Sequence, residues 1–124
     1  MPTFAKSSPE LVARFDATAA RFPQTERRAM FGYPALFVGG NLVTSLFAES
    51  WMIRLDDDDR ARLLALPGAA PFEPMPGRSM AGYATLPPDV VADDSALDEW
   101  VGRAIAFGRT LPPKKERRPK KART

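Results

Sequence analysis

The sequence predicts a single α+β domain in which an antiparallel sheet of about four to five strands packs with helices in two layers. Its 124 residues suit one domain with one core. Apolar residues recur first at helical spacing, then in short runs between turns, and finally at helical spacing again. The 13 prolines are about twice the usual share of roughly 5% and indicate many turns and extended segments. We expect the domain to span residues 1–111.

The first helix is predicted to begin at the sequence Ser7-Ser8-Pro9-Glu10. This sequence offers a serine N-cap, a proline at the first helical position and a Glu10 carboxylate placed to reach back to the Ser7 amide. Apolar side chains then follow at helical spacing, at Leu11, Val12, Phe15, Ala19 and Phe22. Pro23 is expected to end the helix.

Between Arg27 and Leu55 the pattern changes to short apolar runs that are typical of strands. The runs cover residues 36–38, 42–47 and 51–55, and Gly39-Gly40-Asn41 and Ala48-Glu49-Ser50 separate them. The simplest interpretation is three antiparallel strands joined by tight turns.

Two more helices and one more strand are predicted in the second half of the chain. Residues 56–59 are four aspartates. Free amides and the helix dipole favour acidic residues at the start of a helix, so these aspartates predict a short helix over residues 60–66. A further strand is expected at residues 83–86. The last helix is predicted to begin at Asp94-Ser95, with Ser95 and Asp98 at the spacing of a capping box, and Trp100 is expected to anchor it against the sheet.

The composition argues against most catalytic classes. Histidine and cysteine are both absent, so the chain lacks the commonest general base, the best nucleophile and the usual zinc ligands. We therefore expect no enzyme, no cofactor and no metal. The lack of cysteine suits a reducing cytoplasm, and no apolar run approaches the roughly 18 residues that a membrane span needs.

Two short blocks combine Met, aromatic, Gly and Pro residues more densely than a plain helix or strand would. They are Arg28–Val38, with the sequence RAMFGYPALFV, and Phe72–Tyr83, with the sequence FEPMPGRSMAGY. Together with the strand WMIRL at residues 51–55 and the helix sequence LDEW at residues 97–100, they resemble, in this order, the N-terminal domain of TfoX/Sxy proteins. The resemblance covers roughly residues 8–111.

This resemblance implies an α+β domain found in bacteria and named for regulators of competence for DNA uptake. Those regulators cooperate with a cyclic-AMP receptor protein at promoters, and the longer ones also carry a C-terminal helical domain. Here we expect a stand-alone domain, monomeric or homodimeric, that acts as a non-catalytic regulatory module. Its partner is expected to be another protein, for example one of the transcription machinery.

The candidate binding residues come from the two blocks and the strand between them: Arg28, Phe31, Tyr33, Arg54, Glu73, Arg78 and Tyr83. For the first block, core and turn positions are the favoured interpretation over a ligand groove. For Arg54, Glu73 and Arg78 we prefer an Arg–carboxylate pair that fixes the Pro-rich segment on the sheet. The alternative is a small anion, such as a nucleotide phosphate or a carboxylate, between Arg54 and Arg78 in a ligand-binding protein or an enzyme.

A disordered basic tail is predicted over residues 112–124, where seven cations face one acid, while residues 1–111 carry a net charge of −3. The cations are Lys114, Lys115, Arg117, Arg118, Lys120, Lys121 and Arg123. They can contact DNA or RNA phosphates without reading the bases, or they can merely solubilise the terminus. For the aspartates at residues 56–59, a capped helix start is preferred over a cation site.

Overall fold

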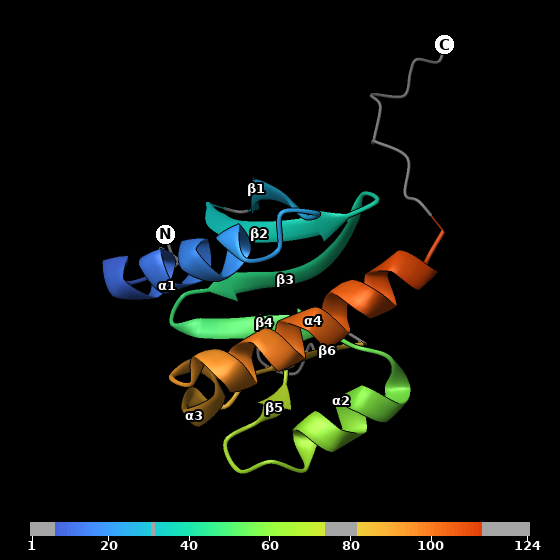
Figure 1. The fold of residues 1–124 in the computed structure, drawn as a ribbon. Helices are drawn as coiled ribbons and strands as arrows, with labels where there is room; N and C mark the ends of the chain where they lie inside the picture. The colour runs from blue at the N-terminus through green and yellow to red at the C-terminus, as the bar shows by residue number, and fades with distance from the viewer. Residues whose placement is uncertain (1–6, 31, 74–81, 113–124) are drawn as a thin grey trace, which may run out of the picture.

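An antiparallel sheet of six strands forms the centre of the structure, a computed structural model that describes residues 7–30, 32–73 and 82–112 (Figure 1). The strand order is β1-β2-β3-β4-β6-β5. The strands are β1 (Glu26–Met30), β2 (Tyr33–Val38), β3 (Asn41–Phe47), β4 (Ser50–Arg54), β5 (Ala70–Pro71) and β6 (Tyr83–Thr85). The α+β class is confirmed, and the strand count exceeds the expected four to five because β1 and the two-residue β5 extend the sheet at its ends.

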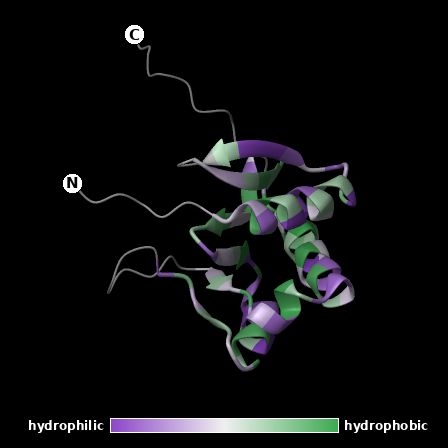
Figure 2. Ribbon diagram, turned by 90° about the vertical axis from the view of Figure 1, so that its left-hand side faces the viewer, coloured by the Kyte–Doolittle hydropathy of each residue, from purple (hydrophilic) through white to green (hydrophobic). Residues whose placement is uncertain are grey.

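The helices cover one face of this sheet (Figures 1 and 2). They are α1 (Pro9–Ala20), α2 (Asp57–Leu64), α3 (Pro88–Val91) and α4 (Asp94–Thr110). Helix α4 runs across the sheet between α1 and α2 (Figure 1). The Arg21 guanidinium of the turn after α1 bonds Asp98 of α4 at 2.8 Å, and Asp59 of α2 bonds Arg103 of α4 at 2.9 Å. In the part of the chain that the structure describes, none of these helices combines the length and the apolarity that a membrane crossing requires.

The helix starts follow the predicted positions but use other side chains. At α1, the Ser8 hydroxyl accepts from the Leu11 amide at 3.2 Å, and the Ser8 amide donates to the Glu49 carboxylate at 2.6 Å. Glu49 therefore satisfies the Ser8 amide at this helix end. The expected reach of Glu10 back to Ser7 is wrong, because the N-cap is Ser8 rather than Ser7. At α4, Asp93 rather than Ser95 is the N-cap, so the predicted capping box is wrong as well.

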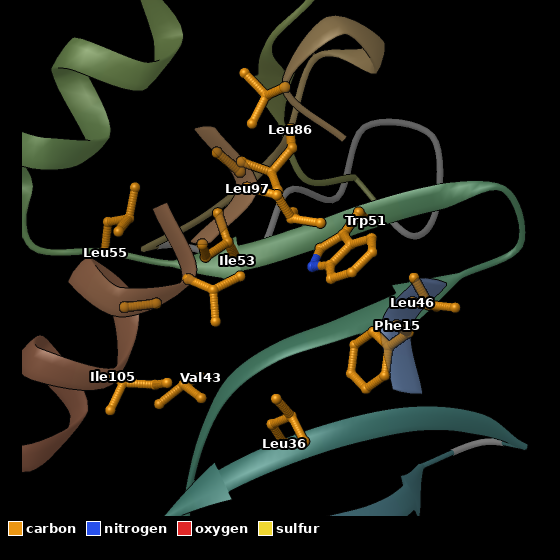
Figure 3. Packing of buried hydrophobic residues seen from close by; sticks show 14 of the residues in the cluster. Phe15, Leu36, Val43, Leu46, Trp51, Ile53, Leu55, Leu86, Leu97 and Ile105 are labelled. Atoms are coloured by element: carbon orange, nitrogen blue, oxygen red, sulfur yellow. The ribbon is translucent and has the colours of Figure 1, made fainter. Parts of the chain in front are cut away.

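The main core lies between the helices and the sheet, and Trp51 is at its centre (Figure 3). The Trp51 side chain is 1% exposed, its ring centroid lies 5.1 Å from that of Phe15, and its indole N–H donates to the Thr44 hydroxyl at 2.8 Å. Trp100, expected to anchor the last helix, does pack against this core but is only partly buried. The buried face of α4 consists of Leu97, Val101, Ala104, Ile105 and Gly108.

The opposite face of the sheet is also covered. Since neighbouring residues of a strand point to opposite faces, Met52 lies on the other side of β4 from Trp51, and it is 1% exposed. On this face the Phe47 ring lies 5.3 Å from the Tyr33 ring and 5.5 Å from the Phe72 ring. The start of the second block, which follows β5, thus packs against the sheet.

Candidate functional site

The end of β4 presents an arginine between two aromatic rings. Arg54 is paired in register with Tyr83 of β6, and its guanidinium carbon lies 5.6 Å from the centre of the Tyr83 ring. The ring of Phe107, from the last turns of α4, lies 5.9 Å from the same carbon. Both distances suit cation–π contacts, so strand pairing and helix packing together fix the position of this charge.

A pocket of about 390 Å³ opens beside this arginine. Arg54, Phe107 and Gly82 line it together with the start of α2, which contributes Leu55, Asp56, Asp57 and Arg60. The acids of this wall are already engaged, since Asp56 caps α2 and Asp57 pairs with Arg60 at 2.8 Å. Among the residues that the structure describes, no carboxylate forms an ion pair with Arg54.

The Tyr83 hydroxyl beside Arg54 remains protonated at neutral pH. Burial raises the pKa of Tyr83 above its ordinary value of 10.0, and the nearby Arg54 charge opposes this rise only in part. A neutral phenol can donate a hydrogen bond to an oxygen anion that approaches Arg54. Arg54 and Tyr83 thus place a positive charge and a neutral phenol side by side at the end of β4.

Phe107 also lines a second pocket, of about 480 Å³. Arg103 lies in this pocket and bonds Glu99 at 2.8 Å and Asp59 at 2.9 Å. The hydrogen bond to Glu99 is the main reason that the pKa of Arg103 is raised. Both carboxylates neutralise Arg103, whereas Arg54 forms no ion pair with any carboxylate in the part of the chain that the structure describes.

A larger pocket, of about 640 Å³, lies elsewhere, between the start of α1, α3 and β4. Two of its charged side chains already serve the fold. Arg14 donates to the Val91 carbonyl and pairs with Asp94 at 2.7 Å, while Glu49 holds the start of α1. We therefore regard the Arg54 pocket as the better candidate site.

The structure divides the predicted binding residues into separate groups. Arg54 and Tyr83 come together, whereas Arg28 lies on β1, with β2 and β3 between it and β4. Tyr33 is 5% exposed beside Phe47, which supports the core interpretation of the first block. Glu73 is exposed and forms no ion pair with Arg54, so the expected Arg–carboxylate pair, if Glu73 makes it, involves Arg78. Phe31 and Arg78 lie outside the described residues.

Phe107 and Arg60 belong to the site but were not predicted. Phe107 lies beside the apolar stripe of the last helix rather than within it, and its only signal in the sequence is an aromatic residue off that stripe. Arg60 follows the four aspartates, whose capped-helix interpretation is confirmed by the Asp56 cap of α2. The cations of the predicted tail, residues 114–123, lie outside the described residues.

The comparisons with known proteins give one match. Residues 17–108 match the family described as TfoX N-terminal domain, and this range includes every strand of the sheet together with Arg54, Tyr83 and Phe107. No curated protein and no solved structure matches the chain.

Proposed function

Because the chain belongs to the TfoX N-terminal domain family, we propose that it is a non-catalytic regulatory module that binds another protein. Arg54, Tyr83 and Phe107 form the centre of its docking surface. The partner contributes an acidic side chain, Asp or Glu, to the pocket beside Arg54. A cytoplasmic location fits a chain without cysteine.

The observation that carries this proposal is that Arg54 pairs with no acid among the residues that the structure describes. The Arg54 guanidinium is held between two rings at 5.6 and 5.9 Å, at the wall of a pocket, so it needs little reordering to accept a carboxylate. Arginine and tyrosine are common among the residues that dominate binding energy at interfaces. An acid that enters this pocket gains a charge-assisted hydrogen bond from Arg54 and a second donor from Tyr83.

The experiment compares affinity capture from the native host by the wild-type chain and by Arg54→Gln, which removes the charge but keeps a similar length. Arg62→Gln is the matched control, because Arg62 is an exposed arginine of α2. The proposal expects a captured protein whose affinity falls at least about tenfold with Arg54→Gln and stays unchanged with Arg62→Gln. Capture that is the same for all three chains, or equally weakened by both variants, contradicts it.

A second function, loose binding of DNA or RNA, is supported by the sequence of the tail, where seven cations face one acid over residues 112–124. Such contacts act on phosphates, so their affinity falls steeply with salt. The test titrates duplex DNA at several salt concentrations into the full chain and into a chain that ends at Pro112. This end point keeps the Asn41 amide on the Pro112 carbonyl at 3.0 Å. If the two chains bind DNA alike, the tail does not carry the binding.

A further inference from the structure

The outer edge of β1 is open in the described structure. β1 ends the strand order and is paired only with β2 there, and the side chains of residues 26–29 are all exposed (Figure 1). An edge strand carries a row of backbone donors and acceptors that another strand can pair with. Charged side chains on such an edge usually discourage pairing, so the arrangement of the charges decides what β1 can accept.

The charges of β1 are sorted between the two faces of the sheet. Arg27 is in register with Leu36, on the helix side, and it pairs with Asp16 of α1 at 2.6 Å. Glu26 and Arg28 lie on the opposite side, where they bond each other at 3.0 Å. This bond from Arg28 is the main reason that the pKa of Glu26 is lowered, so Glu26 is charged at neutral pH.

A second copy can continue the sheet across β1 through a twofold axis perpendicular to the sheet. With this axis, the helix-covered faces of both copies lie on the same side of the joint sheet. Residues that face each other across two strands must point to the same face, and neighbouring residues of one strand point to opposite faces. The axis must therefore lie at a residue position of β1 and not between two positions. An axis through position 26 places Glu26 against Glu26 of the second copy. An axis through position 28 places Arg28 against Arg28 of the second copy.

An axis through position 27 gives a different result, because it places Glu26 of each copy opposite Arg28 of the other, twice. Opposite charges that face each other across two strands stabilise the pair, and like charges destabilise it. The two Arg27 side chains that meet on the axis each remain paired with an Asp16, so these four charges sum to zero. Of the three registers, this one alone brings opposite charges together.

We propose that β1 is a self-association surface, on which a second copy of this chain pairs antiparallel about Arg27 to form a continuous twelve-stranded sheet. The helices leave room for this. Helix α1 packs over β2, and its Phe15 reaches the Trp51 ring on β4, so the two α1 helices stand at least three strand spacings apart, or about 14 Å. Packed helices need only about 8–10 Å between their axes.

The first test uses the absence of cysteine from the chain. Arg27→Cys places one thiol on the proposed axis, where facing Cα atoms of an antiparallel pair lie about 4.5–5.5 Å apart, within the range of a disulfide. Under mild oxidation we expect Arg27→Cys to form a covalent dimer at least about tenfold faster than Arg62→Cys, an exposed control on α2. Equal rates for the two variants overturn the proposal.

The second test uses the charge pairing itself. Glu26→Arg and Arg28→Glu each place like charges opposite each other in a homodimer, so each alone weakens dimerisation by at least about tenfold. Mixing the two variants restores the dimer, because every facing pair is then of opposite sign. Sedimentation over a range of concentrations measures the step from 13.6 kDa to twice that mass. A wild-type chain that stays monomeric, or a mixture that associates no better than the single variants, overturns the proposal.

Discussion

At the scale of single residues, Trp51 joins the polar and apolar parts of the core. Its ring packs on Phe15, and its indole N–H bonds the Thr44 hydroxyl, which in turn donates to the Met52 carbonyl at 2.7 Å. Trp51→Ala is expected to lower the free energy of unfolding by about 3–5 kcal/mol, the usual range for a buried aromatic residue. Trp100→Ala is the control, and urea unfolding that shows an equal loss for both variants contradicts this assignment.

Tyr83 makes stability depend on alkaline pH. Burial raises its pKa in the folded chain, so in the unfolded chain it ionises first, near its ordinary value of 10.0. The stabilisation is complete below the unfolded pKa and is lost as the pH rises through the folded pKa. Unfolding measured at pH 9 and pH 11 should therefore show a smaller loss for Tyr83→Phe than for the wild type. An equal loss in both contradicts the buried position of this hydroxyl.

The cap residues show why local prediction from the sequence is incomplete. Ser8 and Asp56 are readable as caps because each bonds an amide three residues further along its own helix. Glu49, by contrast, reaches the start of α1 from a turn 41 residues away, and no local spacing signals such a contact. Asp93 is the cap instead of the expected Ser95 because its carboxylate, two residues earlier, accepts from both the Ser95 and Ala96 amides.

At the scale of the elements, two glycines of α4 test how closely this helix approaches the sheet. A Cβ added at Gly108 would lie 2.6 Å from Cγ1 of the buried Val43, whereas one added at Gly102 would meet only a Phe22 ring carbon at 3.9 Å. Gly→Ala in a helix interior gains up to about 1 kcal/mol. Gly102→Ala should therefore raise the melting temperature, and Gly108→Ala should lower it, because overpacking costs about 1–3 kcal/mol. Two variants that change stability in the same direction would contradict the close contact of α4 with β3.

The elements with a clear apolar pattern were predictable and the edge strands were not. Strands β2, β3, β4 and β6 and helices α1, α2 and α4 fall where apolar runs or periodic stripes indicate them. β1 has the sequence ERRAM, whose first three residues are charged, and it is a strand because β2 offers a partner on one side. β5 has only two residues and depends in the same way on β6.

At the scale of the whole molecule, the strand order decides which predicted residues meet. The sequence places Arg28 and Arg54 in separate segments, but only the order β1-β2-β3-β4-β6-β5 shows that Arg28 lies on an edge strand and Arg54 beside Tyr83. Phe107 completes the site because α4 crosses the sheet and its last turns bring this ring to 5.9 Å from the Arg54 guanidinium carbon, a tertiary arrangement without a local signature. Arg54 and Tyr83 were therefore predictable as candidate site residues from the sequence, and Phe107 was not.

The charge distribution over the whole chain leads to a prediction for the tail. Residues 112–124 carry a net charge of +6 and residues 1–111 a net charge of −3, so DNA affinity should depend on the tail alone. If all seven cations contact phosphates, a plot of the logarithm of the association constant against the logarithm of the salt concentration should have a slope of about −6 for the full chain. A chain that ends at Pro112 should show no measurable affinity. Tight binding by this shortened chain would show instead that the folded part carries the contacts.

The most direct measurement for the proposed docking surface is photo-crosslinking in the native host. A photoreactive amino acid replaces Ala106, which lines the second, 480 Å³ pocket together with Phe107. In the control, it replaces Ala17 on the exposed side of α1. We predict a crosslinked protein from position 106 that is absent from position 17 and that disappears when Arg54→Gln is added. The same crosslinks from both positions, or a crosslink from position 106 that persists without the Arg54 charge, would contradict the proposal.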